Sequence, residues 1–157
     1  MSRLTDRIAG ALVDAGSTPV SFHKIISEGN MDNERHISIK RILLPKDTNP
    51  RGEVFGGAIL AEIDLAGAVE AKLHTRHDVA TRFVNGVEFR HPVKVGDVVS
   101  FFTQLVKIGN TSITVKVEVE FSRDGQAAPV AVVATEVVYV AIAHHPDGSI
   151  SKVPVKS

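Results

Sequence analysis

The chain has 157 residues, which is long enough for one domain with a buried core. Hydrophobic residues make up 43% of it and charged residues 23%, as in an ordinary globular protein. Eighteen basic residues balance eighteen acidic ones, so charge provides no general attraction to nucleic acid or to a membrane surface. The sequence contains no cysteine, which excludes disulfide bonds, thiolate metal sites and a cysteine nucleophile.

The cellular location is predicted from the lack of two sequence signals, a membrane-spanning helix and a secretory signal. No run approaches the ~20 apolar residues that a membrane-spanning helix needs. The first eight residues carry an acidic side chain and no apolar core of a secretory signal. We therefore expect a cytoplasmic protein.

Residues 1–33 are expected to form a leader outside the main domain, which would span residues 34–157. Leu4, Ile8, Leu12 and Ala15 recur at helical spacing, and the stretch 16–19, Gly-Ser-Thr-Pro, stops that pattern. We predict a short amphipathic helix followed by an irregular linker.

The remaining patterns predict one strand, one long helix and four further strands. The expected strands are His36–Leu44, Thr81–Arg90, Asp97–Ile108, Thr111–Phe121 and Val130–Ile142, and the helix runs from Gly56 to His74 or His77. A polar tail follows from His144. Short turns join the last strands, which favours antiparallel pairing. We predict an α+β domain whose antiparallel sheet wraps one helix, and this helix is apolar enough to be buried on nearly every side.

The stretch from Asp47 to Ala68 holds the residues best suited to chemistry. Gly56 and Gly57 open the helix, where unpaired N–H groups and the positive end of the helix dipole suit an oxyanion. Asp64 lies among small and apolar neighbours, where a carboxylate is costly unless it is paired or has a function. It can act as a base or as a nucleophile. Glu62 has a comparable apolar neighbourhood on the opposite face of the helix. Two plainer alternatives also remain: the glycines form only a turn, and the acid has only a structural role.

Helix geometry limits how these groups can cooperate. Asp64 lies eight residues after Gly56, which is about 12 Å at ~1.5 Å per residue. One small carbonyl group cannot contact both positions of the same chain. If both act on one substrate, they come from two chains with antiparallel helices, and the enzyme is at least a dimer.

Two blocks of sequence resemble a known family. The first reads Leu44-Pro45-Lys46-Asp47-Thr48-Asn49, Gly52, Phe55-Gly56-Gly57 and Asp64-Leu65-Ala66-Gly67, and the second reads Val84-Asn85-Gly86-Val87-Glu88-Phe89, Pro92-Val93 and Val95-Gly96-Asp97. Together they resemble the YciA-type acyl-CoA thioesterases of the hotdog fold. The resemblance runs from about Arg35 to Pro154.

The resemblance implies a fold, an assembly and a set of roles. The sheet would curl around the helix, and two units would pair into a homodimer, with dimers joining into a homohexamer as a trimer of dimers. Asp64 matches the catalytic acid, Asn49 the polar residue that places the water or the thioester, and Gly56 and Gly57 the amides that polarise the carbonyl. The acid and the other three residues would come from opposite subunits. The substrate would be an acyl-CoA, and no metal or redox cofactor is expected.

Candidates for binding the CoA part of the substrate are Arg51, Arg90, Lys107 and Ser112. Relatives often carry a basic residue near the CoA phosphates where this chain has Asn110. Exposed Lys and Arg side chains at strand ends are also commonly only solvated charges.

Three alternatives remain open at this point. Glu70, His74, His77 and Asp78 near the helix end have a spacing that a metal site can use, although histidines also suit a helix C-terminus because of its dipole. A non-catalytic hotdog module that binds acyl-CoA has no need of a base. A hotdog hydratase or dehydratase would need a histidine motif that His91-Pro92 does not supply.

Overall fold

The computed structural model describes residues 34–157. The leader and its expected helix lie outside the described residues. The elements are β1 His36–Ile42, the 3-10 helix η1 Pro45–Asp47, α3 Gly56–Lys72, β2 Asp78–Val84, β3 Val98–Ile108, β4 Ser112–Ser122, β5 Val130–His144 and β6 Ile150–Lys152.

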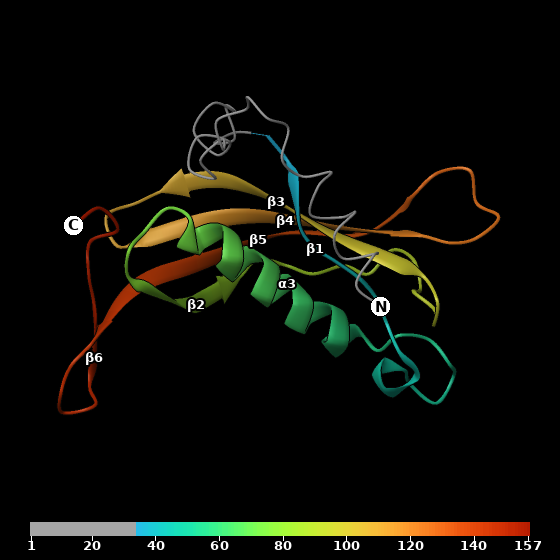
Figure 1. The fold of residues 1–157 in the computed structure, drawn as a ribbon, viewed down its shortest axis with the longest axis horizontal. Coiled ribbons are helices and arrows are strands. Elements are labelled where there is room, and N and C mark those ends of the chain that lie inside the picture. Colours follow the sequence, from blue (N-terminus) through green and yellow to red (C-terminus); the bar gives the residue numbers. More distant parts are fainter. Residues whose placement is uncertain (1–33) are drawn as a thin grey trace, which may run out of the picture. The chain divides into compact units, whose positions relative to one another are not determined.

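The described strands form one antiparallel sheet in the order β1-β3-β4-β5-β2, and β6 also pairs with β5 (Figure 1). Short turns join β3, β4 and β5, as the pattern of alternating residues predicts. Strands β1 and β2 are therefore the two opposite edges of the main sheet. The α+β architecture with one central helix is confirmed.

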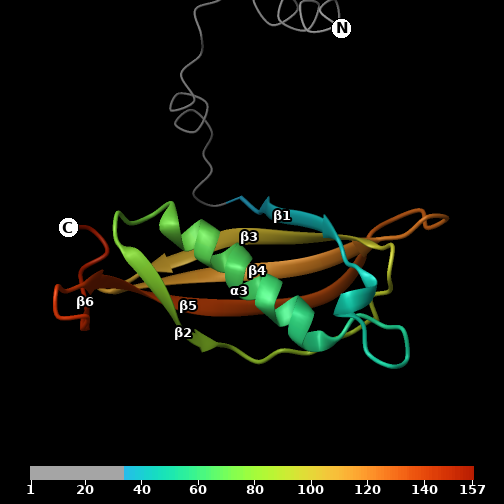
Figure 2. The same cartoon turned by 60° about the horizontal axis from the view of Figure 1, so that its bottom comes forward.

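Helix α3 lies across one face of the sheet, as the turned view shows (Figure 2). Its buried side chains recur every three or four residues: Ile59, Ile63, Ala66, Glu70 and Ala71, together with Gly67. The opposite face leaves Leu65 at 55% and Val69 at 50% exposed. Burial on nearly every side is thus wrong for a single chain, because the apolar residues of α3 serve the core on one face and remain at the surface on the other.

The edges of several elements differ from the prediction. Strand β2 begins three residues before Thr81 and ends at Val84 rather than Arg90. The segment beyond it still follows β5 loosely, since the N–H groups of Asn85 and Arg90 donate to the carbonyls of Glu136 and Val132. Helix α3 ends at Lys72, short of His74.

Strand β6 was not predicted from the polar tail. The turn before it closes through a hydrogen bond from the Gly148 N–H to the His145 carbonyl, at 2.9 Å, and Gly148 has a φ of 83°. A positive φ favours glycine. The turn folds the tail back, so that Ile150–Lys152 pairs with the end of β5. Among the helices of residues 34–157, none is long and apolar enough to cross a membrane.

Candidate active site

Asn49 is held by a tight turn between η1 and α3. Its side-chain Oδ1 accepts the N–H groups of Arg51 at 2.9 Å and Glu53 at 3.2 Å. Its own N–H donates to the Glu53 carbonyl at 2.7 Å. Because Oδ1 is engaged twice by the backbone, the amide NH2 of Asn49 remains as the hydrogen-bond donor that this side chain can offer to a ligand.

Two glycines start α3 for a steric reason. A Cβ on Gly56 would lie 3.2 Å from the ring of Phe89, and one on Gly57 would lie 2.3 Å from Cζ of Phe55. The N-cap residue Phe55 makes no capping bond through its side chain. The two glycines thus let aromatic rings pack against the first turn of α3, where the Ala58 N–H donates to the Phe55 carbonyl and no side chain caps the helix.

Asn49 and Gly56 line one pocket with a volume of about 230 Å³. Its walls combine apolar and polar residues: Arg51, Glu53, Val54, Ile59, Phe89, His91, Pro92, Val93 and Val132. Asp64 does not line it. The structure thus brings together the predicted polar residue and the helix start, and leaves the predicted acid apart from them.

Asp64 is half-buried on α3, at the side of the helix that faces β2. Its Oδ1 accepts a hydrogen bond of 2.5 Å from the hydroxyl of Thr81 on β2. Its backbone carbonyl accepts one of 2.7 Å from the hydroxyl of Tyr139 on β5. Burial, and then the negative charge of Asp64, raise the pKa of Tyr139, so this hydroxyl stays a donor.

Neither Thr81 nor Tyr139 was identified from the sequence. The signal that points to Tyr139 is Gly67, because a Cβ at that position would lie 2.3 Å from the tyrosine hydroxyl. A glycine within a helix usually costs stability. Here it admits the hydroxyl that binds the Asp64 carbonyl.

Glu62 and Asp64 differ in their partners. Glu62 forms an ion pair with Arg41 of β1, whose guanidinium also lies 3.7 Å from Asp47. Asp64 takes part in none of the ion pairs formed within residues 34–157. Glu62 is therefore neutralised locally on the β1 side of α3, whereas Asp64 on the β2 side keeps an uncompensated carboxylate.

The four candidates for CoA binding fall into two groups. Arg51 lines the pocket, and Arg90 lies in the segment whose backbone contacts β5 beside it. Lys107 and Ser112 flank the β3–β4 turn. That turn is near the end of α3, since Val155 accepts from the Thr75 hydroxyl and donates its N–H to Asn110. The 17 residues of α3 span about 26 Å, so one chain does not bring the two groups together.

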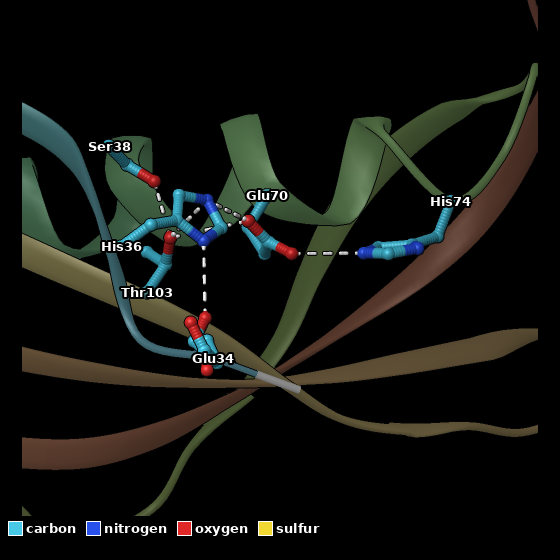
Figure 3. A network of polar contacts seen from close by, with 6 residues as sticks. All are labelled: Glu34, His36, Ser38, Glu70, His74 and Thr103. Atoms are coloured by element: carbon cyan, nitrogen blue, oxygen red, sulfur yellow. Dashed lines mark hydrogen bonds and ion pairs between the residues drawn. The ribbon is translucent and has the colours of Figure 1, made fainter. Parts of the chain in front are cut away.

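Of the four residues considered for a metal site, Glu70 and His74 contact each other (Figure 3), whereas His77 and Asp78 have other partners. Glu70 is 2% exposed and lies 2.8 Å from Nε2 of His36 and 2.9 Å from Nε2 of His74. His77 instead contacts the Ser157 hydroxyl at 2.7 Å, and Asp78 pairs with Lys72. Within residues 34–157, no group of three such side chains is placed to hold a metal ion. Glu70 belongs to a closed polar network with His36, His74 and Thr103.

Comparisons with known proteins agree on one family. A model of the thioesterase superfamily matches residues 51–128. An uncharacterized acyl-CoA thioester hydrolase of Buchnera aphidicola is 46% identical over 81 residues, or 52% of this chain and 60% of that protein. The acyl-CoA thioester hydrolase YciA of Salmonella typhimurium is 35% identical over 130 residues, or 80% of this chain and 97% of that protein.

A solved structure agrees in fold. A hexameric hotdog-fold thioesterase of Campylobacter jejuni is 36% identical with a TM-score of 0.66, covering 80% of this chain and 92% of that one. The chain therefore belongs to the thioesterase superfamily and, within it, to the YciA-type acyl-CoA thioester hydrolases with the hotdog fold.

Proposed function

We propose that the protein hydrolyses acyl-CoA thioesters to a free carboxylic acid and CoA at a site shared by two subunits. One observation carries the proposal. Asn49 and Gly56 line a pocket that Asp64 of the same chain does not line, and Asp64 has no cationic partner among the described residues. Each chain thus carries a pocket and an acid that lie apart. Under this proposal, the pocket of one chain meets Asp64 of a second chain across an interface.

The pocket supplies the groups that polarise the thioester. The N–H groups of Gly56 and Gly57, backed by the dipole of α3, would bind the carbonyl oxygen as its charge develops. The amide NH2 of Asn49 would hold the water or the thioester. The rings of Phe55 and Phe89 pack against this turn and would limit water there, which strengthens such hydrogen bonds.

Asp64 of the second subunit would drive the attack. As a general base it takes a proton from water while the water oxygen bonds to the carbonyl carbon, and the C–S bond then breaks to release the CoA thiolate. As a nucleophile its carboxylate displaces the thiolate, and water hydrolyses the resulting anhydride. The Thr81 hydroxyl orients the carboxylate in either case.

The second subunit would pair along the β2 edge. Exposed apolar side chains lie there on both elements: Leu60 of α3, one turn before Asp64, and Phe83 and Val84 of β2. An uncovered edge strand pairs readily with another chain. For Asp64 to reach the partner's Gly56 with antiparallel helices, the two-fold axis passes near Leu60, midway between them.

This arrangement also accounts for the two groups of CoA candidates. With the axis near Leu60, the second half of each α3 extends about 12 Å beyond the partner's helix start. Lys107 and Ser112 of one subunit would then lie past the pocket that Arg51 and Arg90 of the other flank, along the path of the CoA tail. Further association of dimers into a hexamer, the state of the Campylobacter jejuni relative, is part of the proposal.

The test is thiol release from acyl-CoAs of several chain lengths. Asp64→Asn should lower turnover by about 10²- to 10⁴-fold while the protein stays folded and binds CoA. Glu62→Gln is the matched control on the same helix and should stay within a few-fold of the native rate. Unchanged turnover in Asp64→Asn would end the catalytic assignment.

Two further results separate the alternatives. A native protein that binds acyl-CoA without releasing thiol would be a binding module, and a product with water added to or removed from the acyl chain would indicate a hydratase or dehydratase. Since the proposed groups need no metal or redox cofactor, activity should survive dialysis against a chelator.

A further inference from the structure

His91 lines the pocket with Asn49 and Gly56, yet the proposed mechanism gives it no role. It lies in the irregular segment between β2 and β3. Two backbone hydrogen bonds hold this segment: the Arg90 N–H donates to the Val132 carbonyl at 2.9 Å, and Val93 accepts from the Val54 N–H at 2.8 Å. The backbone on either side of His91 is thus hydrogen-bonded to other segments of the same chain.

The ring of His91 is held as well. Its Nδ1 lies 3.0 Å from the carbonyl oxygen of Ala131. A carbonyl only accepts hydrogen bonds, so Nδ1 carries the hydrogen, and Nε2 of the neutral ring keeps a lone pair. His91 therefore offers a hydrogen-bond acceptor in a fixed orientation.

The other polar groups at the pocket are mainly donors. Asn49 offers its NH2, the start of α3 offers N–H groups, and Arg51 offers its guanidinium. The remaining acceptor side chain, the carboxylate of Glu53, faces Arg51 at 3.5 Å. Asn49 Oδ1 is already taken by two backbone N–H groups, so Nε2 of His91 is the side-chain acceptor of this pocket that no hydrogen bond or ion pair within residues 34–157 occupies.

A ligand that fits this set carries a carbonyl oxygen and, close by, an N–H group. An acyl-CoA has both. The thioester sulfur is followed by two methylene groups and then by the first amide N–H of the pantetheine arm. A pocket of about 230 Å³ has room for the thioester and this short stretch.

We propose that His91 binds the substrate by accepting, at Nε2, the hydrogen bond of the pantetheine amide nearest the sulfur. This inference rests on the proposed function and adds a recognition element to it. The helix start and Asn49 would bind the carbonyl side of the thioester, and His91 the leaving-group side.

Two short thioesters test the contact. S-acyl-N-acetylcysteamine keeps this amide N–H, and the matching S-acyl-2-mercaptoethyl acetate has an ester oxygen in its place. The native protein should favour the amide by about tenfold in kcat/KM, the value of one neutral hydrogen bond, mainly through KM. If either compound is cleaved too slowly, the ratio of their inhibition constants against acyl-CoA provides the same comparison.

The variants decide whether the preference depends on His91. His91→Ala should reduce the ratio to about one, and His91→Gln, whose side-chain carbonyl can accept, should keep part of it. His145→Ala is the control, because that exposed histidine bonds to Ser151 in the tail. Equal treatment of the two compounds by the native protein, or a preference that persists in His91→Ala, would overturn the role of His91 alone. Failure of the native protein to cleave acyl-CoA would instead overturn the proposed function.

Discussion

The two sides of α3 are built differently. On the β1 side, Arg41 forms an ion pair with Glu62, and the carboxylate of Glu70 contacts the rings of His36 and His74. On the β2 side, Asp64 has the hydroxyl groups of Thr81 and Tyr139 as partners and no cation among the described residues. Phe83 and Val84 expose apolar surface there, while the ion pair of Asp78 with Lys72 lies at the other end of β2. We call these the ionic side and the apolar side. This difference supports the proposal that a second copy of the chain packs against the β2 side of α3.

The largest effect is expected when a charged side chain is introduced on the β2 side or, as a control, on the β1 side. Phe83→Asp on β2 should block dimer formation and lower turnover by about 1,000-fold, because each subunit then lacks half of the site. Ile42→Asp on β1 is the matched control, since Phe83 is 56% and Ile42 53% exposed. Light scattering and thiol release measure the two effects. A monomeric Phe83→Asp with native turnover would show that the apolar side is not the functional interface.

The ionic side is tested by stability rather than by activity. Glu70→Gln leaves two histidines facing an amide that cannot accept from both, and breaking such a buried pair should cost about 3 kcal/mol of unfolding free energy. Glu120→Gln, at a more exposed ion pair with Arg35, should cost about 0.5 kcal/mol. Urea unfolding measures both. Equal losses would mean that the Glu70 network contributes no more than a surface pair.

A smaller effect, with a pH dependence, is expected at Asp97, which immediately precedes β3 and pairs with Arg123. Burial opposes its ionisation, but hydrogen bonds of 2.7 Å from Arg123 and of 2.8 Å from the Lys94 N–H outweigh this and lower its pKa. A lowered pKa adds stability above the unfolded value of about 3.9, and this is lost as the pH falls through the folded value.

Asp97→Asn should therefore be less stable than the native protein by about 2 kcal/mol at pH 7. The difference in unfolding free energy should begin to narrow below about pH 4, where the carboxyl of the unfolded chain takes up a proton, and should disappear at lower pH as the native carboxyl is protonated. Urea unfolding at pH 7, 5 and 3 measures it. A gap that stays constant over this range would contradict the role of charge at Asp97.

The smallest expected effect concerns the support of Asp64. Gly67→Ala places a methyl group against the Tyr139 hydroxyl and should cost about 1 kcal/mol, after the better helix propensity of alanine is counted. Tyr139→Phe should also cost about 1 kcal/mol through the lost hydrogen bond. The double variant should cost less than the sum, because the clash and the bond share one hydroxyl. If the two losses of unfolding free energy simply add, Gly67 and Tyr139 act independently and do not share one contact.

The order of elements and the central helix were predictable because periodicity and turn residues are local signals. The five strands and the helix of the prediction all exist. The ends of β2 and the presence of β6 were not predictable, since both depend on which residues pair with β5. The structure thus corrects the ends of elements rather than their kind.

The candidate site was predictable only in part. The placement of Asn49 beside Gly56 follows from a short turn into a helix. The different surroundings of Glu62 and Asp64 did not follow from the sequence, because Glu62 meets Arg41 of β1 and the sequence does not show which strand flanks which face of α3. Thr81, Tyr139 and His91 were missed as site residues for the same reason: each reaches the site through tertiary contacts.

Subunit sharing is the central claim, and hybrid dimers test it most directly. Asp64→Asn and Asn49→Ala should each be nearly inactive alone. After reversible dissociation and mixing in equal amounts, half of the dimers are hybrids, and each hybrid has one intact site and one doubly altered site. We expect recovery of about a quarter of the native activity, in proportion to the hybrid fraction. Dimers shown to be mixed that recover no activity, or a strictly monomeric protein that cleaves acyl-CoA at the native rate, would contradict a site made by two chains.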